Sequence, residues 1–298
     1  MSKWSLALSI VLIAPGSALA ATSCADVSFS QPATIGNWNP IAPGQQQAGF
    51  TATITRATGS IKTVRLILLD ASTTQPLQLS TSGPVYTVLN GSEGIVFPSG
   101  TSVQTANTTL IDLGGNKSQN VPLTFTVPAN SGAADWVGGA SYVENLGYAI
   151  QCFTANGKVD STSGPFSAGG PTLRLTIPSI VSATIAQPAV LDFQNFTSLS
   201  QLLNISVKST ASVNVAVANP GFMSLNGSTS PPDNSKIGYS MTLDSAPVAA
   251  GSSSINRPRA TVGGRPFPLL LTLAGNGASG KLPGNYTSTI VVTLSPGT

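Results

Sequence analysis

The alternation of apolar and polar residues is the main pattern in this sequence, and it is clearest near the C-terminus. After a Pro-Gly turn signal at 283–284, the side chains of Tyr286, Ile290, Val292 and Leu294 fall on one side of an extended segment. β-Branched residues fill most of the positions between them, which favours a β-strand. No further strand-like segment follows, so we expect one edge of this strand to lack a neighbour within the chain.

The same period-two pattern recurs in two blocks and predicts an all-β protein. Strand-like segments occur at 25–30, 49–55, 64–69, 85–89, 121–127 and 148–153, and then at 173–177, 203–207, 213–217, 238–243, 268–273 and 286–294. No stretch of useful length shows helical periodicity. An immunoglobulin-like sandwich needs about seven strands, and the second block has about six. The pattern therefore predicts two tandem immunoglobulin-like or pilin-like β-sandwiches, of which the C-terminal one lacks its final strand.

The boundaries of these units follow from composition. A stretch rich in Gly, Ser and Pro at residues 154–172 predicts a linker between a first domain at 21–153 and a second at 173–298. Residues 1–20 have the pattern of a secretory signal peptide, with a basic start, an apolar run and a small-x-small cleavage site. The apolar run is too short to span a membrane. We therefore expect an exported, soluble mature protein.

Composition and cysteine content refine this picture. Charged residues make up only 8% of the chain and apolar residues 41%, with 30 Gly and 22 Pro. Because the apolar residues are numerous and patterned, the low charge indicates β-sandwiches with hydroxyl-rich solvent faces rather than disorder. The two cysteines, Cys24 and Cys152, both lie in the first domain, and in an exported chain they predict one disulfide that ties its ends together. Closing so long a loop would stabilise the domain by up to about 5 kcal/mol.

Several classes of chemistry find no support in the sequence. The chain has no histidine, which removes Ser-His-Asp and Cys-His catalysis and the commonest metal ligand. Its carboxylates are too dispersed to nominate an acid pair. Residues 275–281 imitate a phosphate-binding loop, but Leu282 stands where Ser or Thr should follow, and a hairpin loop is the better interpretation. Basic residues are scattered, which argues against nucleic-acid binding. We therefore expect no enzyme, no cofactor and no metal site.

Short motifs at both ends of the mature chain resemble a known family. Cys24 followed by Ile35-Gly-Asn-Trp-Asn-Pro40 resembles the opening of the spore coat protein U family, although Ile35 replaces the usual aromatic residue. The segment 282–286 and the strand after it are similar to the last strand of that family and of fimbrial subunits. Two such modules in tandem, only one of them with cysteines, resemble the two-domain tip adhesin of archaic chaperone–usher pili.

The resemblance implies a mechanism that matches the missing strand. A periplasmic chaperone lends a strand to each subunit, an outer-membrane usher assembles the subunits, and the adjacent pilin subunit then donates its own strand. The residues expected to face the empty groove are Tyr286, Ile290, Val292 and Leu294. The alternative is that these are ordinary core residues of a closed sandwich. Cleavage after Ala20 would leave three residues before Cys24, too few to donate, so we expect this subunit at the pilus tip on the cell surface.

Two Gly-bounded apolar segments are candidates for surface attachment. They contain Ile95, Val96 and Phe97 in one loop and Trp136 and Val137 in another. If exposed together, they would form a hydrophobic patch that adheres to abiotic or host surfaces in biofilm formation. The alternative is that the aromatic residues fill the end of the core. Competing functions are a structural shaft pilin or secreted coat or matrix protein, and a glycan-binding lectin.

Overall fold

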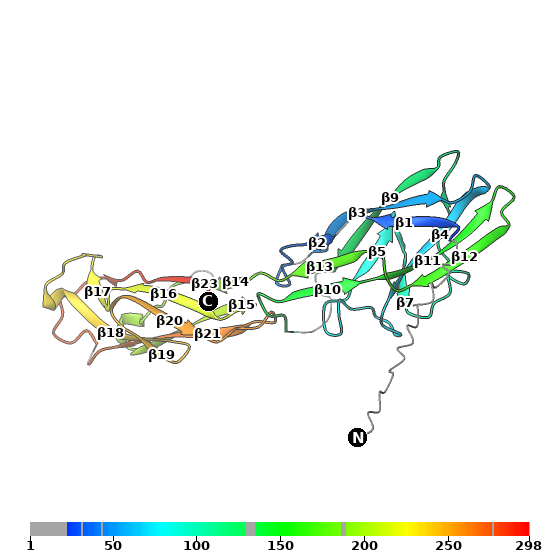
Figure 1. Ribbon diagram of the computed structural model, residues 1–298. Helices are drawn as coiled ribbons and strands as arrows, with labels where there is room; N and C mark the ends of the chain where they lie inside the picture. Colours follow the sequence, from blue (N-terminus) through cyan, green and yellow to red (C-terminus); the bar gives the residue numbers. More distant parts are fainter. Residues whose placement is uncertain are drawn as a thin grey trace, which may run out of the picture.

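The computed structural model describes residues 23–30, 32–42, 44–128, 135–185, 189–275 and 277–297. The predicted signal peptide lies outside them. The described chain consists of β-strands and two short 3₁₀ helices, η1 (Gln194–Phe196) and η2 (Asp233–Ser235), with no α-helix. It therefore holds no helix able to cross a membrane. The strands form two sandwiches arranged end to end in an elongated molecule (Figure 1). The all-β fold is thus confirmed.

Three sheets build the first sandwich. One contains, in spatial order, β1 (Ala25–Phe29), β3 (Gln46–Arg56), β9 (Ser118–Val127), β5 (Thr87–Asn90) and β6 (Glu93–Gly94). The facing sheet contains β12 (Val159–Phe166), β11 (Gly147–Thr154), β4 (Ile61–Asp70) and β7 (Val96–Pro98), with β8 (Ile111–Asp112) also paired to β4. A small third sheet contains β10 (Ser141–Asn145), β13 (Thr172–Thr176) and β2 (Ala33–Ile35).

The sequence pattern of β4 follows from burial on both of its faces. Leu66 and Leu68 point into the main core, whereas Ile67 and Leu69 pack into a smaller cluster on the other face. The segment 99–110 covers that outer face, since it supplies Val103 and Ala106 to the small cluster. A strand that is buried on both faces has a nearly continuous apolar sequence. β4 has such a sequence because this loop covers the face that would otherwise contact water.

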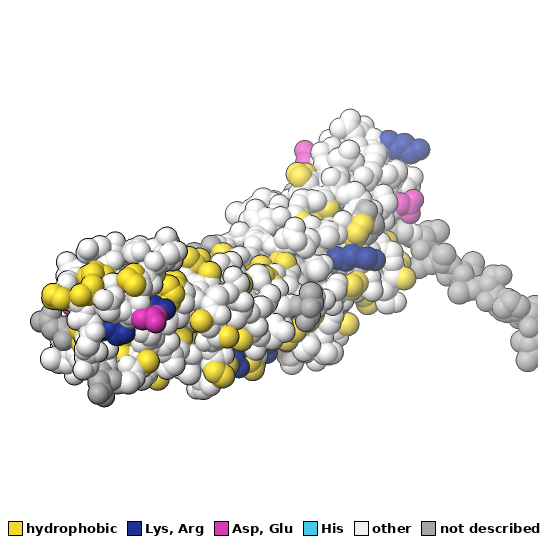
Figure 2. All heavy atoms as spheres, turned by 90° about the vertical axis from the view of Figure 1, so that its left-hand side faces the viewer, with side chains coloured by type: hydrophobic (Ala, Val, Ile, Leu, Met, Phe, Trp, Pro, Cys, Tyr) yellow, Lys and Arg dark blue, Asp and Glu magenta, His cyan; other side chains and the backbone are white. Residues whose placement is uncertain are grey.

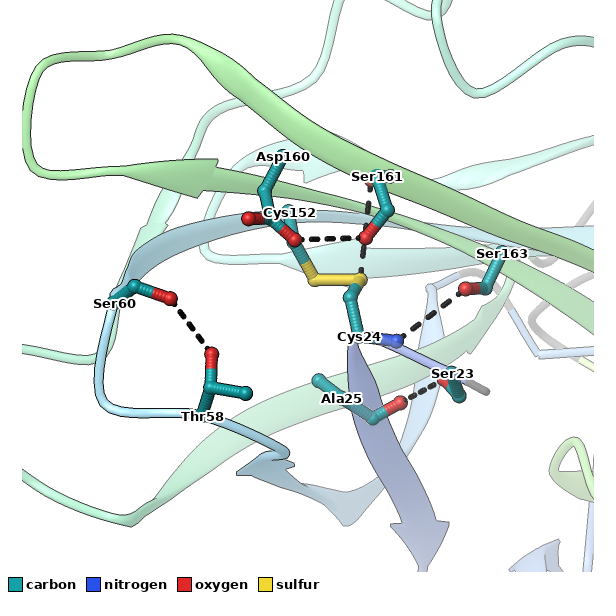
Figure 3. Close-up of a disulfide and its surroundings, with 9 residues drawn as sticks. All are labelled: Ser23, Cys24, Ala25, Thr58, Ser60, Cys152, Asp160, Ser161 and Ser163. Atoms are coloured by element: carbon teal, nitrogen blue, oxygen red, sulfur yellow. Dashed lines mark hydrogen bonds between the residues drawn. A yellow bond between two sulfur atoms is a disulfide. The ribbon is translucent and has the colours of Figure 1, made fainter. Parts of the chain in front are cut away.

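The predicted disulfide is present between Cys24, just before β1, and Cys152 on β11 (Figure 3). The two Cα atoms are 6.2 Å apart. The backbone nitrogen of Cys24 also donates a hydrogen bond to Ser163 Oγ, at 3.4 Å. These contacts tie the start of the first sandwich to its second sheet.

Two sheets build the second sandwich. The larger contains β14 (Val181–Ile185), β15 (Ser200–Ser209), β21 (Arg265–Leu273), β18 (Lys236–Leu243), β17 (Phe222–Leu225) and β22 (Tyr286–Thr287), with β19 (Ala246–Val248) also paired to β18. The smaller contains β20 (Gly251–Arg257), β16 (Val213–Asn219) and β23 (Val291–Pro296). The segment that imitates a phosphate-binding loop lies between β21 and β22, and residues 277–280 form turns there.

Residues 154–172 do not form the predicted linker. Residues 159–166 are β12, which pairs with β11, and the next strand, β13, pairs with β10 and β2. Leu173, Leu175 and Ile177 are fully buried in the first core, not in the second. The glycines in this stretch serve close packing, since a Cβ on Gly170 would lie 2.0 Å from the carbonyl oxygen of Leu146. Gly-rich composition marked a tight approach of strands here rather than a flexible connection.

The two sandwiches are joined by hydrogen bonds as well as by the chain. Arg259 of the second sandwich donates from Nη1 to the carbonyl oxygen of Trp136, at 3.0 Å, and pairs through Nη2 with Asp135. The backbone nitrogen of Gly138 donates to the carbonyl oxygen of Thr210, at 2.7 Å. Val262 packs against the first core. The second sandwich therefore contacts the first at several points around the connection.

Candidate strand-accepting groove

The last strand of the chain is less buried than the strand beside it, although both have the same pattern. In the antiparallel register of β16 and β23, Val217 lies opposite Val292 and Val215 lies opposite Leu294. Val215 is 0% exposed and Val217 is 2% exposed, whereas Val292 and Leu294 are only partly buried. All four side chains face the second core. The difference arises because β16 has a strand on each side, while β23 has only β16 among the described residues.

A groove of about 630 Å³ opens beside β23. Its floor is made by inward-facing side chains of the larger sheet, among them Leu203, Ile205, Leu269, Leu271, Met223 and Tyr239. One wall is the β22–β23 segment, and the opposite wall is formed by the end of β14 and residues 189–193. Among the described residues that line it, Asp192 alone is charged. The groove is thus an apolar channel between two strand edges, and such a channel matches the inward side of one further β-strand.

The hydroxyl groups of the two tyrosines that line the groove, Tyr239 and Tyr286, both have hydrogen-bond partners. The Tyr286 hydroxyl donates to the carbonyl oxygen of Leu282, at 2.7 Å, and its ring packs edge-on against Phe196. The Tyr239 hydroxyl lies 3.1 Å from Ser288 Oγ. Burial raises the pKa of Tyr239, so this hydroxyl stays protonated. The polar atoms at this end are therefore satisfied without an incoming strand, which leaves the apolar surface and the β23 edge open.

The structure brings most of the expected groove residues together. Tyr286, Ile290 and Val292 line the groove, while Leu294 packs on the same core without lining it. The period-two pattern did not predict the opposite wall, where Val190 is 70% exposed and Leu191 and Phe193 pack on the core. The only sequence signal for this wall is the mostly apolar run at residues 189–193, just before η1, and that run has no period-two pattern.

The first predicted attachment loop is part of the core, which corrects the expectation of an exposed crest. Ile95 is 3% exposed and Val96 is 9% exposed, and Phe97 packs against the outer cluster of β4. The cause is strand pairing, because β7 lies parallel to β4 and the Ile95 nitrogen donates to Val88 O, at 2.9 Å.

The second predicted loop also faces inward. Trp136 is 5% exposed, and its ring makes edge contacts with Trp38 and Tyr142 at centroid distances of 5.5 and 6.1 Å. Val137 is 49% exposed, but it lies next to the junction with the second sandwich rather than at a free end. These two segments do not form an apolar attachment surface.

The far end of the first sandwich is built from three polar turns. The Arg56 guanidinium holds two of them together, since Nη2 donates to Gly115 O at 2.8 Å and Nη1 to Ile61 O at 3.1 Å. Thr154 pairs with Ile61, which brings the β11–β12 turn alongside. The turns consist mainly of Gly, Ser, Thr, Asn and Lys at residues 57–60, 113–117 and 155–158.

Comparisons with known proteins give weak likenesses only. No protein-family model and no curated protein sequence matches the chain. A chain of the CsuC–CsuE chaperone–tip adhesion subunit complex of Acinetobacter baumannii is 13% identical over 91% of this chain and 99% of its own, with a TM-score of 0.47. The CupB6 tip adhesin of Pseudomonas aeruginosa is 11% identical, over 91% of this chain and 92% of its own, with a TM-score of 0.34. Both scores are below 0.5, so the function proposed below rests on the groove.

Proposed function

We propose that this chain is a subunit of a chaperone–usher pilus, and that a strand from another polypeptide completes its second sandwich. The observation that carries the proposal is the partly buried inward face of β23 beside a groove of about 630 Å³. A strand laid in this groove would pair with the free edge of β23 and cover the lining side chains. Burying an aliphatic side chain fully contributes about 1.5–3 kcal/mol, so a few such contacts supply substantial affinity.

An open groove also explains why a chaperone is needed. An unpaired edge next to apolar surface is prone to join other chains. Figure 2, which looks onto the second sandwich, shows several hydrophobic side chains at that end, with a few charged ones among them. A periplasmic chaperone would protect this surface during export. An outer-membrane usher and the adjacent subunit would then replace the chaperone with the subunit's own strand.

The arrangement of the two sandwiches supports a place at the pilus tip. The strands that line the groove belong to the second sandwich, while the first sandwich, with β1, β4 and β12, lies at the opposite end of the molecule (Figure 1). Residues 25–29 are built into the first sandwich as β1 and are not free to be donated. A strand from the adjacent subunit would occupy the groove. The first sandwich would then project outward from the cell surface as the adhesive module in biofilm formation.

Two measurements test this function. We expect the full chain to be recovered from an oxidising periplasm as a one-to-one complex with a co-expressed pilus chaperone from its source, and to aggregate without it. Recovery of a stable monomer without any chaperone would refute strand acceptance. Antibody against the first sandwich should label pilus ends in electron micrographs, and label spaced along the shaft would refute the tip position and favour a shaft subunit.

A further inference from the structure

A second cavity, of about 690 Å³, lies in the first sandwich between β10 and the loop from the end of β4 to β5. Its two acidic residues are Asp70, the last residue of β4, and Glu144 of β10. The other lining side chains are mainly uncharged and polar: Ser72, Thr74, Gln75, Gln78, Ser80 and Thr81. Ligand cavities commonly have volumes of roughly 300–1,000 Å³, so its size suits a small polar molecule.

The wall of this cavity is fixed before any ligand arrives. Leu77 and Leu79 anchor the loop in the first core, at 4% and 0% exposure. Ser80 then bonds to β10 twice, since its nitrogen donates to Glu144 Oε2 at 2.7 Å and its Oγ donates to Val143 O at 2.9 Å. A loop held at both its apolar and its polar residues gives a preformed site, which lowers the entropy lost on binding.

The two carboxylates differ in whether an oxygen remains without a hydrogen-bond partner in the described chain. Asp70 is 3% exposed and both its oxygens are occupied, because Oδ1 accepts from the Ser72 nitrogen at 2.7 Å and Oδ2 accepts from the Tyr86 hydroxyl. Burial raises the pKa of Tyr86 well above its usual range, so Tyr86 keeps the proton that it donates. Glu144 is 9% exposed, and within the described chain only its Oε2 has a hydrogen-bond partner. Oε1 of Glu144 is therefore available to a ligand.

Among the described residues, no basic side chain compensates this negative charge. Within the part of the chain that the structure describes, every ion pair lies elsewhere, and neither Asp70 nor Glu144 pairs with Lys or Arg. Burial, reinforced by the charge of Asp70 and opposed by the bond from Ser80, raises the pKa of the Glu144 carboxyl. Uncompensated buried carboxylates are costly, and a ligand cation would relieve that cost.

We propose that this cavity binds an amino sugar with a free amine, placing its ammonium group against Glu144 Oε1. The amide groups of Gln75 and Gln78, which have no hydrogen-bond partner within the described chain, then bond the sugar hydroxyls. The proposal names a ligand for the proposed adhesive module, but it does not depend on the groove.

Other cations fit the cavity less well. A lysine side chain packs its four methylene groups along apolar surface, and among the described residues of the lining only Ala71 and Pro76 are apolar. Ca²⁺ takes six to eight oxygen ligands, several of them carboxylates, and no group of three or more possible metal-ligating His, Cys, Asp or Glu residues occurs in the described chain. A hydroxyl-bearing ammonium ligand uses both the carboxylate and the amide walls.

The test is calorimetric titration of the full mature chain, carrying its chaperone if the complex forms, with the β-1,4-linked trimer of glucosamine. The matched probe is the trimer of N-acetylglucosamine, in which the charge is removed. We expect the free amine to bind at least tenfold more tightly than the acetylated sugar. Equal affinities, absence of binding, equal affinity for trilysine, or binding of Ca²⁺ alone would each overturn the proposal.

Variants locate the site and separate it from pilus assembly. Glu144→Gln should weaken glucosamine-trimer binding at least tenfold, and Gln78→Ala, at an exposed side chain outside the core, should weaken it severalfold without affecting folding. Asp160→Asn removes an exposed carboxylate at the far end of the sandwich and should leave affinity unchanged. If Asp160→Asn weakens binding as much as Glu144→Gln does, the ligand is held by general charge and the assignment fails. All three variants should still bind the chaperone, so a failed groove and a failed sugar site give different results.

Discussion

The inward face of β23 can be tested with two adjacent substitutions. Val292→Asp places a carboxylate on the groove side, opposite the buried Val217. Thr293→Asp places the same group one residue further along, on the exposed outer face of the strand. The two variants have the same charge and almost the same position. They differ in whether a donated strand would cover the new carboxylate, and Val292→Asp also loses a partly buried valine.

The expected loss of strand affinity depends on whether water can reach the new carboxylate. In the chain alone the groove is open, so the new carboxylate at position 292 stays hydrated and the stability loss is below the roughly 1.5–3 kcal/mol of a fully buried valine. Under a donated strand the carboxylate would be buried without a partner, which costs several kcal/mol. Taking about 4 kcal/mol of that cost, the affinity for the strand falls about a thousandfold, since about 1.4 kcal/mol corresponds to a factor of ten.

The assay is co-purification of each variant with the co-expressed chaperone, followed by counting of assembled pili. We expect Val292→Asp to lose the complex and Thr293→Asp to retain it. If both variants bind the chaperone as the unmodified chain does, β23 is not the edge that receives a strand, and the reasoning from its exposure is wrong.

Three further outcomes follow from the first sandwich and the junction. Replacing Cys24 and Cys152 with Ala should lower the free energy of unfolding of the first sandwich by up to about 5 kcal/mol, measured by denaturant titration, with the second sandwich unchanged. The raised pKa of Glu144 means that the folded chain binds the Glu144 proton more tightly than the unfolded chain does. Protonated Glu144 therefore contributes fully to stability below its ordinary pKa of 4.5, and this contribution is lost as the pH rises through the pKa of the folded state. Tm should accordingly fall less between pH 4 and pH 7 in Glu144→Gln than in the unmodified chain. Arg259→Ala removes the ion pair with Asp135 and should widen the distribution of inter-sandwich distances in small-angle X-ray scattering, without changing the secondary structure seen by circular dichroism.

Period-two patterning predicted the strands where one face meets the core and the other meets water. The segment predicted at 213–217 is the centre of β16, and its three valines are fully or almost fully buried. The disulfide could also be predicted, because two cysteines in an exported chain have one pairing. Neither prediction requires knowledge of which strands lie side by side in the fold.

The remaining differences depend on long-range contacts, which the pattern does not contain. Glycines near 164–170 signalled a linker, but they permit close packing of strands in the first sandwich. Trp136 sits between glycine-rich segments and still packs against Trp38, about a hundred residues earlier. The polar cavity was not foreseen either, since Asp70 and Glu144 come from strands in different sheets and look unremarkable as isolated acidic residues.

The strand count in the sequence predicts an unfinished sandwich, but alternation alone does not show which strand lacks a neighbour. The alternating segments of β16 and β23 have the same kind of pattern, because alternation reports which side chains face inward and not whether a strand lies beside them. β4 shows the opposite case, in which a loop covers an outer face and converts alternation into a continuous apolar run. The partial exposure of Val292 and Leu294 opposite buried valines therefore carries information that no count of strand-like segments supplies. It locates the incomplete edge at β23, and an edge of that kind is completed by another polypeptide or remains a site of aggregation.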